Sequence, residues 1–395
     1  RNMFSYLYKG YFPRELHIDY VTNGVHHSTW TSKAWLNLYK EYWGKIYEAD
    51  DSLIWNTHNN EKKTLIEFVK NHLKDDFTRR AEKPQLYFQT VAELTEDKFI
   101  VGFARRFATY KRAYLLFSDL ERLKQIVDSG VVFIFAGKAH PQDNAGQDII
   151  KHIVEISKMP QFVGKIIFLE NYDMYLAKHL IRGVDLWLNT PTRPLEASGT
   201  SGEKAIMNGV VNFSVLDGWW AEGYNSKAGW ALSEEQTYQS NDYQNAFDAE
   251  MIYNIFENEI IPCFNYKDEN GIRVKWVERM KHTIALIAPH FTMKRQLDDY
   301  YEKFYNKMFE RYRKFSENNA QLAKEYSEWK IKMSRLWNSI ELLELNIPDT
   351  ENAGFDLDDI FVAKLSLSLG NIEAEHIGVE MIIADKENNL INDYN

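Results

Sequence analysis

Cysteine is almost absent from this sequence, since Cys263 is the only one in 395 residues. One cysteine cannot form an internal disulfide or supply an all-cysteine zinc site, and we assign no metal ligands. Because so few cysteines are typical of proteins from a reducing compartment, we expect a cytoplasmic protein. The sequence also lacks an apolar stretch long enough to span a bilayer, which argues against a membrane protein.

Dense runs of basic residues are lacking too. Lysine and arginine total 47 against 57 aspartate and glutamate residues, which gives a formal net charge of −10. An acidic chain without a basic run is a poor partner for nucleic acid or for an anionic membrane. Any basic patch must therefore be local, and we expect it to serve a small anion.

What the sequence does contain is typical of a soluble globular protein, with 45% hydrophobic and 26% charged residues. The chain is too long for one ordinary core, so we expect two or three units. The N-terminal Arg1-Asn2-Met3 is neither a signal peptide nor a natural start. Strand-like segments also run close to the last residue, Asn395, so we expect a chain that is cut at both ends.

From residue 98 onward, continuous apolar runs alternate with amphipathic segments. The predicted strands are 99–103, 131–137, 165–169, 184–188 and 210–215, and the predicted helices between them are 114–127, 145–157 and 175–181, with a short one before the last strand. This alternation predicts a parallel sheet covered by helices on both faces. Such sheets bind ligands at the carboxyl ends of their strands.

The segments on either side of this alternation have other patterns. Residues 15–95 are mainly helical, with an amphipathic helix at 56–74 that follows a strand and an Asn-Gly turn at 20–25. After the sheet we expect a long helical region at 248–345, a linker at 346–354, and strands at 365–369 and 378–383. Two strands do not make a stable sheet unaided, so the last part reads as the start of a β unit.

The first candidate segment for chemistry follows the first predicted strand. It carries four cations in eight residues, namely Arg105, Arg106, Lys111 and Arg112. Arginine binds phosphate through paired hydrogen bonds, and lysine binds it as a point charge. At the end of a parallel strand of an acidic protein, the cluster predicts an anion pocket. The alternative reading of these residues is a solvated loop held by salt bridges.

The second candidate segment is Glu-Ala-Ser-Gly-Thr-Ser-Gly-Glu-Lys at 196–204, before a short helix. Its glycines and hydroxyl residues can wrap an anion with backbone N–H groups. We expect Lys204 at the start of the helix, where nearby N–H dipoles lower its pKa and suit it to a covalent bond with an aldehyde cofactor. The alternative is a Gly/Ser turn followed by an exposed lysine.

The third candidate segment is Leu-Glu-Asn-Tyr-Asp at 169–173, at the end of the third predicted strand. It brings an aromatic ring, Tyr172, and amide groups to the same edge of the sheet. Taken by itself, Tyr172 reads as a packing residue.

Together and in this order, the segments resemble the α-glucan phosphorylase family. The residues that carry the resemblance are Thr22-Asn23-Gly24-Val25, Arg106 with Tyr110-Lys111-Arg112, Gly137-Lys138-Ala139, Phe168-Leu169-Glu170-Asn171-Tyr172, Glu196-Ala197-Ser198-Gly199-Thr200 with Lys204, and Asn208-Gly209. The resemblance covers about residues 15–310, and several ordered motifs are more specific than any one. Asn189-Thr190-Pro191 and Leu216-Asp217-Gly218-Trp219-Trp220 are similar to the short bacterial and archaeal branch of the family.

The resemblance implies an α/β fold of the GT-B type, in which two Rossmann-like domains face each other across a cleft. Residues 1–95 would be the tail of the first domain and a helical connection. Residues 96–345 would be the Rossmann-like domain for cofactor and phosphate with its C-terminal helices, and residues 346–395 a linker and the start of a truncated β domain.

The resemblance also implies an activity, a cofactor and residue roles. Such enzymes cleave α-1,4-glucan, as glycogen or maltodextrin, with inorganic phosphate to give glucose 1-phosphate, and the 5′-phosphate of pyridoxal 5′-phosphate relays a proton. By resemblance, Lys204 holds this cofactor with Arg105, Thr200, Ser201 and Tyr172 nearby. Arg106 and Lys111 would hold the substrate phosphate, and Glu196, Ser198 and Gly199 would bind hydroxyls of the transferred glucose.

Three positions depart from the commoner pattern of the family. Glu203 stands where methionine usually precedes the lysine, Arg105 replaces a lysine, and Asp173 replaces an arginine. Arg105 preserves the positive charge, whereas Asp173 cannot help to hold phosphate. Glu203 could pair with Lys204 and hinder loading of the cofactor.

Two other functions stay open at this point. A nucleotide-sugar-dependent glycosyltransferase of the glycogen-synthase type would share the fold, and a non-catalytic glucan-binding protein would fit the incomplete cleft. Lys204 and Tyr110-Lys111-Arg112 favour the phosphorylase. Because the first domain is expected to form one wall of the cleft, we expect the chain to need that domain and to be inactive alone. Whether it forms a homo-oligomer stays open.

Overall fold

The computed structural model describes residues 2–8, 16, 18–232, 240–347, 362–384 and 390–394. The α-helices are α1 (His27–Trp30), α2 (Lys33–Tyr42), α3 (Asp51–Arg79), α4 (Pro84–Ala92), α5 (Leu120–Asp128), α6 (Asn144–Ser157), α7 (Met174–Gly183), α8 (Thr200–Ile206), α9 (Trp219–Gly223), α10 (Asn241–Ile255), α11 (Ile261–Asn265), α12 (Val274–His282), α13 (Met293–Tyr300) and α14 (Asn306–Leu336). The strands are β1 (Phe99–Ala104), β2 (Val131–Ala136), β3 (Ile166–Leu169), β4 (Leu186–Asn189), β5 (Val211–Val215), β6 (Gly229–Leu232), β7 (Glu341–Asn346), β8 (Lys364–Ser368), β9 (Met381–Ala384) and β10 (Leu390–Tyr394).

Residue contacts divide the chain into two compact units. One is Thr22–Asp298, and the other joins Arg1–Val21 to Asp299–Asn395. Every candidate site residue belongs to the first unit, whereas the second contains the antiparallel pairs β7–β8 and β9–β10. The domain division at residues 95 and 345 remains a prediction. Within the described residues, the helices are too short or too polar to cross a membrane.

One parallel sheet organises the first unit. Its strand order is β3-β2-β1-β4-β5-β6, with Phe99 opposite Val131 and Ala104 opposite Ala136 where β1 pairs with β2. This is the order of a Rossmann-type sheet, and it reverses between β1 and β4. The predicted α/β class and the five predicted strands are therefore confirmed. The short strand β6, Gly-Trp-Ala-Leu, has no counterpart among the predictions.

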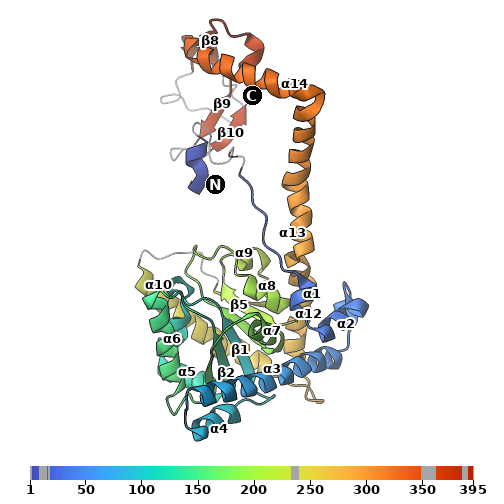
Figure 1. Ribbon diagram of the computed structural model, residues 1–395, viewed down its shortest axis with the longest axis vertical. Helices are drawn as coiled ribbons and strands as arrows, with labels where there is room; N and C mark the ends of the chain where they lie inside the picture. The colour runs from blue at the N-terminus through green and yellow to red at the C-terminus, as the bar shows by residue number, and fades with distance from the viewer. Residues whose placement is uncertain are drawn as a thin grey trace. The chain divides into compact units, whose positions relative to one another are not determined.

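Helices cover both faces of the sheet (Figure 1). Successive side chains of a strand point to opposite faces, so β1 sends Phe99 and Phe103 into one core and Ile100 into the other. The first core also contains side chains of α5, α6, α10 and α12, and the second contains side chains of α3, α7 and α8. Burial on both faces is the reason why β1, β2 and β3 are unbroken apolar runs in the sequence, and why β4 and β5 are mainly apolar.

A buried charge network fastens α3 to the amino end of the sheet. Asp185, just before β4, lies 2.8 Å from His58 Nε2 and 2.7 Å from Lys62 Nζ, and it accepts a hydrogen bond from the Ile100 amide at 2.7 Å. The side chains of Asp185, His58 and Lys62 are fully buried. Burial alone would raise the pKa of Asp185, but Lys62 and His58 hold it below its usual range. The network lies at the edge of the sheet opposite to the candidate site, so it supports the scaffold.

The expected strand and turn at residues 20–25, all of which are described, are wrong. Val25 alone forms a parallel bridge, with Thr292, and neither Asn23 nor Gly24 has a positive φ. Gly24 is needed for a different reason, because a Cβ at this position would lie 2.4 Å from the carbonyl oxygen of Thr292. The motif therefore serves a close approach of two backbone segments.

Two helical predictions need correction. The segment 114–127 is interrupted, because a 3-10 helix, Ala113–Phe117, precedes α5 and Asp119 caps α5 by accepting hydrogen bonds from its first amides. The helical region predicted for 248–345 ends at Ser339, and Glu341–Asn346 is β7. The leucines of Glu341–Asn346 are compatible with a helix or a strand, and pairing with β8, which is distant in sequence, makes this segment a strand. The predicted linker falls mostly outside the described residues, and the two late strands correspond to β8 and β9.

Candidate active site

The candidate residues lie on loops at the carboxyl edge of the sheet. Arg105 follows β1, Tyr172 follows β3, Thr190 follows β4 and Asp217 follows β5. Strands β1 and β4 are the neighbours between which the strand order reverses. In a doubly wound sheet, this reversal opens a crevice for a ligand.

The loop after β1 is held in one shape by the loop after β2. The Arg105 amide donates to the Ala136 carbonyl at 3.1 Å, and the Phe107 amide donates to the Lys138 carbonyl at 3.0 Å. A Cβ at Gly137, which has a φ of +152°, would lie 2.0 Å from the Arg105 carbonyl oxygen. The Gly-Lys motif after β2 therefore allows the two loops to approach closely.

Arg112 does not belong to the anion pocket, so the expectation of four converging cations is wrong for this residue. Its buried guanidinium donates to the carbonyls of Thr190 and Pro191 at 3.0 and 2.9 Å. It also lies 2.6 Å from Asp248 Oδ2. Arg112 thus ties the β1 loop to the β4 loop and to α10.

Glu196 brings two of the other cations together. Its Oε2 atom lies 2.5 Å from Arg105 Nη2 and 2.5 Å from Lys111 Nζ. The three side chains are only 10%, 7% and 9% exposed, in that order. Within the described residues, the buried Nε and Nη1 atoms of Arg105 have no hydrogen-bond partner. Burial also lowers the pKa of Arg105, although Glu196 opposes the shift. An anion with several oxygens would satisfy the donors that Glu196 leaves open.

Arg106 is placed differently from the residues beside it. Its side chain is exposed, and it makes no hydrogen bond or ion pair with the part of the chain that the structure describes. The structure therefore brings Lys111 together with Arg105 and leaves Arg106 outside this cluster. The role of Arg106 in holding substrate phosphate stays a prediction.

Asp217 fixes the loop that carries Glu196, and sequence reasoning did not single it out as a site residue. Its Oδ2 atom accepts a hydrogen bond from the Glu196 amide at 2.9 Å, and the Trp219 amide donates to the Ser198 carbonyl at 2.8 Å. A Cβ at Gly218 would lie 2.4 Å from that carbonyl oxygen. The Asp-Gly-Trp run after β5, noted above for its resemblance only, is thus the support of the 196–199 loop.

Lys204 does not lie at a helix start as expected. It lies in the last turn of α8, which begins at Thr200 after Gly199 in the left-handed conformation. The pKa of Lys204 is lowered, but the cause is burial rather than the N–H dipoles of the first turn. Its Nζ atom lies 4.2 Å from the centre of the Trp30 ring. Trp30 was also missed, because the sequence places it far from Lys204.

The α1–α2 segment holds α8 in place through Asn208. The Ser32 amide donates to Asn208 Oδ1 at 2.8 Å, and Asn208 Nδ2 donates to the carbonyls of Lys204 and Trp30 at 3.1 and 3.2 Å. Tyr39 adds a hydrogen bond from its hydroxyl to the Met207 carbonyl at 2.9 Å. Asn208 of the Asn-Gly motif therefore links the helix that carries Lys204 to the segment that carries Trp30 through hydrogen bonds, a link called the Asn208 clamp below.

The remaining predicted cofactor residues also lie at the carboxyl edge of the sheet. Thr200 and Ser201 open α8, and Ser201 Oγ accepts a hydrogen bond from Trp187 Nε1 at 3.2 Å. Tyr172 is mostly buried; burial raises its pKa and nearby Arg105 opposes this shift. Asp173 has a local role, because its carboxylate caps α7 by accepting a hydrogen bond from the Leu176 amide at 2.8 Å.

Glu203 is fully buried behind the 196–199 loop. Burial raises its pKa to about 8, and Ser198 Oγ lies 3.4 Å from Glu203 Oε1. Its Oε2 atom has no partner among the described residues. Burial therefore favours the protonated form of Glu203, and no ion pair joins it to Lys204 within the described residues.

Comparison with known proteins decides the family. The model of the carbohydrate phosphorylase family matches residues 2–228, which is more than half of the chain. The chain belongs to the carbohydrate phosphorylase family. The resemblance inferred from the motifs is thereby confirmed.

Curated relatives in this family include three that align with most of the chain. A glycogen phosphorylase from Aquifex aeolicus (strain VF5) is 45% identical over 323 residues, which cover 78% of this chain and 46% of the relative. A maltodextrin phosphorylase from Thermococcus litoralis is 40% identical over 360 residues, covering 87% and 42%. A glycogen phosphorylase from Mycobacterium bovis is 33% identical over 374 residues, covering 90% and 43%. The chain thus spans less than half the length of these phosphorylases.

The residues of this chain fit pyridoxal phosphate, the cofactor that the family implies. A half-buried lysine with a lowered pKa suits covalent attachment of the aldehyde. The unpartnered buried nitrogens of Arg105 suit a phosphate group, and the rings of Trp30 and Tyr172 suit a planar ring. Burial favours the protonated form of Glu203, which weakens its attraction for Lys204.

Proposed function

We propose that this chain provides the cofactor and phosphate side of an α-1,4-glucan phosphorylase. Such an enzyme transfers the terminal glucosyl unit of glycogen or maltodextrin to inorganic phosphate and releases glucose 1-phosphate. The observation that carries the proposal is the convergence of Arg105 and Lys111 on one oxygen of Glu196, in a family member with a half-buried lysine at position 204. The names of the relatives, glycogen and maltodextrin phosphorylase, support the same substrate class.

Substrate phosphate would take the place of Glu196 on Arg105 and Lys111. Both anions are acceptors for the same two donors, Arg105 Nη2 and Lys111 Nζ. Phosphate has more oxygens than a carboxylate, so it can accept from both donors, and Arg105 Nε and Nη1, which Glu196 does not reach, stay available to the phosphate group of the cofactor. The displaced carboxylate would then accept a hydrogen bond from a hydroxyl group of the transferred glucose, beside Ser198 and Gly199. The exchange keeps the buried cations compensated throughout, which avoids the penalty of an unpaired buried charge.

When bound, pyridoxal 5′-phosphate would supply a phosphate group that exchanges a proton with the substrate phosphate. Lys204 would anchor it, with Arg105, Thr200, Ser201 and Tyr172 around it. Arg106 would add positive charge at the exposed side of the anion site and would have to turn toward the substrate. We further propose a cytoplasmic enzyme that needs the rest of the family's length to complete its cleft, so that the 395-residue chain is inactive alone.

Labelling of Lys204 tests the cofactor assignment without any activity. The chain is saturated with pyridoxal 5′-phosphate and reduced with borohydride, and its peptides are weighed. The added mass is expected on the peptide that contains Lys204 and is expected to vanish in Lys204→Met. Labelling of another lysine, or of none, would contradict the assignment and would favour the glycogen-synthase type of enzyme, which uses a nucleotide sugar.

Replacement of Lys111 tests the phosphate site in the natural full-length enzyme. Lys111→Ala removes a donor in a buried pocket, so we expect KM for phosphate to rise and kcat to fall, by roughly 10²-fold in kcat/KM. KM for maltodextrin should change little. Lys151→Ala is the control, since Lys151 is an exposed residue of α6. Normal phosphate saturation in Lys111→Ala would place the anion site elsewhere.

A further inference from the structure

The unit Thr22–Asp298 contains a cavity that is lined by other residues than the anion site. Its volume is about 960 Å³, and it opens between α2 and the segment 289–298. Neither Arg105, Lys111, Glu196 nor Lys204 lines it. Its size is within the range of sites that bind small molecules.

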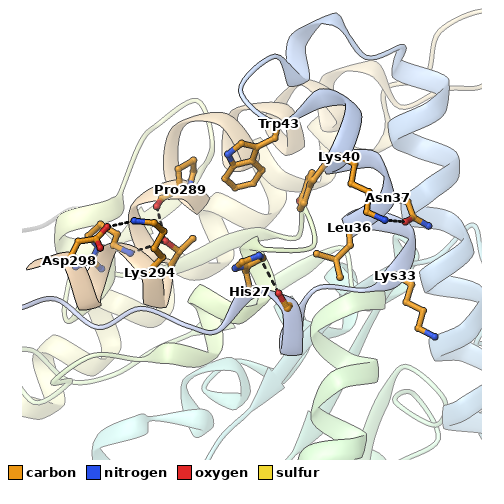
Figure 2. Close-up of a pocket in the computed structure, with 13 residues that line it drawn as sticks. His27, Lys33, Leu36, Asn37, Lys40, Trp43, Pro289, Lys294 and Asp298 are labelled. Carbon is orange, nitrogen blue, oxygen red and sulfur yellow. Dashed lines mark hydrogen bonds and ion pairs between the residues drawn. The ribbon is translucent and has the colours of Figure 1, made fainter.

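The walls of the cavity combine apolar and aromatic surface with positive charge. Figure 2 shows Leu36 of α2 and Trp43, the residue after α2, on one side, Pro289 and Lys294 on the other, and His27 between them. The lining residues with charge, apart from His27, are Lys33, Lys40, Lys294, Arg295 and Asp298. The lining therefore has four cationic residues and one carboxylate, an excess of positive charge, whereas the whole chain has a net charge of −10.

The charged groups of the lining are not equivalent. Lys294 is paired with Asp298 at 2.5 Å, and Arg295 donates to backbone carbonyls of Thr22 and Asn23. Among the residues that the structure describes, Lys40 donates only to the neutral Asn37, at 3.1 Å. Lys33 makes no hydrogen bond or ion pair within the described residues. The lysines of α2 are therefore the cations that an incoming anion can neutralise.

Trp43 supplies the surface for a ring. It is 49% exposed and meets the buried Tyr39 edge to face, with ring centres 5.3 Å apart. One side of the indole is thus held and the rest is open. An exposed ring beside unneutralised lysines suits a ligand that has both a ring and a negative charge.

We propose that this cavity binds a small organic phosphomonoester, with its ring on Trp43 and its phosphate toward Lys33 and Lys40. A phosphomonoester carries a charge close to −2 at neutral pH, which the two positive charges of Lys33 and Lys40 match. The ring can be a sugar or a nucleobase. The proposal does not depend on the phosphorylase activity, because none of the residues assigned to that activity contributes to the cavity.

Calorimetric titrations with defined probes test the proposal. The probes are ribose 5-phosphate, uridine 5′-monophosphate, inorganic phosphate and neutral uridine. They are added to the 395-residue chain with Lys111→Ala, so that the anion site at Arg105 is impaired. We expect one molecule of a phosphomonoester to bind, tighter than inorganic phosphate or uridine, and more weakly as salt is raised. A preference for one of the two esters distinguishes a sugar phosphate from a nucleotide.

Variants of the lining locate the binding. Trp43→Ala is expected to weaken uridine 5′-monophosphate by about fivefold or more, and Trp43→Phe should restore part of the loss. The double variant Lys33→Ala, Lys40→Ala should weaken both esters by about fivefold or more and reduce the salt dependence. Trp337→Ala and Lys151→Ala are matched controls, because both residues are exposed and neither lines the cavity.

Three results would overturn the proposal. The first is that neither ester binds more tightly than inorganic phosphate. The second is binding that the Trp43 and lysine variants leave unchanged, which would place the ligand elsewhere. The third is loss of binding in the natural full-length protein together with protection of Trp43 from a soluble quencher, which would show that another part of that protein covers the cavity.

Discussion

Replacement of Asp185 gives a quantitative test of how the scaffold is held together. Asp185 is fully buried and contacts His58, Lys62 and the Ile100 amide at 2.7 to 2.8 Å. Asp185→Ala leaves the Lys62 ammonium fully buried with only the Lys98 carbonyl as its partner. Removal of one member of a buried ion pair costs about 3–5 kcal/mol, because the other charge stays uncompensated.

The loss can be measured by thermal unfolding followed by tryptophan fluorescence. For a unit of this size, each kcal/mol changes Tm by roughly 2–4 °C, so we expect Tm to fall by roughly 10 °C. Lys63→Met is the control on the same helix, since Lys63 pairs with Glu96 at the surface and should contribute less than about 1 kcal/mol. Lys62→Met combined with Asp185→Ala should cost less than the sum of the two single changes.

The pH dependence checks the cause. The folded-state pKa of Asp185 is lowered, so its contribution is complete above the unfolded pKa of about 3.9 and is lost as pH falls through the folded pKa. The difference between the wild type and Asp185→Asn should therefore shrink below about pH 4. A destabilisation under about 1 kcal/mol in Asp185→Ala at neutral pH would refute the reasoning.

Three further predictions concern the site. Because burial raises the pKa of Glu203 to about 8, the contribution of Glu203 to the free energy of unfolding falls as pH rises from about 4.5 to 8. We therefore expect Glu203→Met to be more stable than the wild type by roughly 2–4 kcal/mol at pH 9, and by less at pH 5, as measured by urea unfolding. Asp217→Ala removes the acceptor of the Glu196 amide, so we expect KM for phosphate to rise by roughly threefold to tenfold in the full-length enzyme, and by less in Asp217→Asn. The same KM in the wild type and both variants would contradict the proposed role of Asp217 in positioning Glu196. Asn208→Ala removes the hydrogen bonds that connect Ser32 to the helix of Lys204, so we expect pyridoxal phosphate to be lost faster during gel filtration, as followed by its absorbance. Unchanged retention of the cofactor would contradict this role of Asn208.

The local sequence pattern was enough to predict the scaffold and the edge of the sheet at which the three candidate segments lie. Strands β1 to β3 are apolar over their whole length because both faces are buried, and β4 and β5 are mainly apolar for the same reason, with Asn189, Asn212 and Ser214 as buried polar exceptions. Since parallel strands end at one edge, the loops at 105–112, 169–173 and 196–204 could be expected to meet there. Their shared edge and the order of their motifs also led to the correct family.

Tertiary contacts decided the features that depend on partners distant in sequence. Whether Glu341–Asn346 is helix or strand depended on β8, and the fate of residues 20–25 depended on Thr292. The sequence also did not predict the partners within the cation cluster. Arg112 contacts Asp248 and two backbone carbonyls, whereas Arg105 and Lys111 both contact Glu196.

The chemistry of Lys204 shows where the two contributions divide. The sequence by itself determined that a lysine follows a glycine-rich loop at the carboxyl edge of a parallel sheet. It could not determine why the pKa of this lysine is low, because burial is set by chain segments far away, here the α1–α2 segment with Trp30 and its clamp at Asn208. Desolvation depends on everything that surrounds a charge, and only the tertiary structure brings those surroundings together.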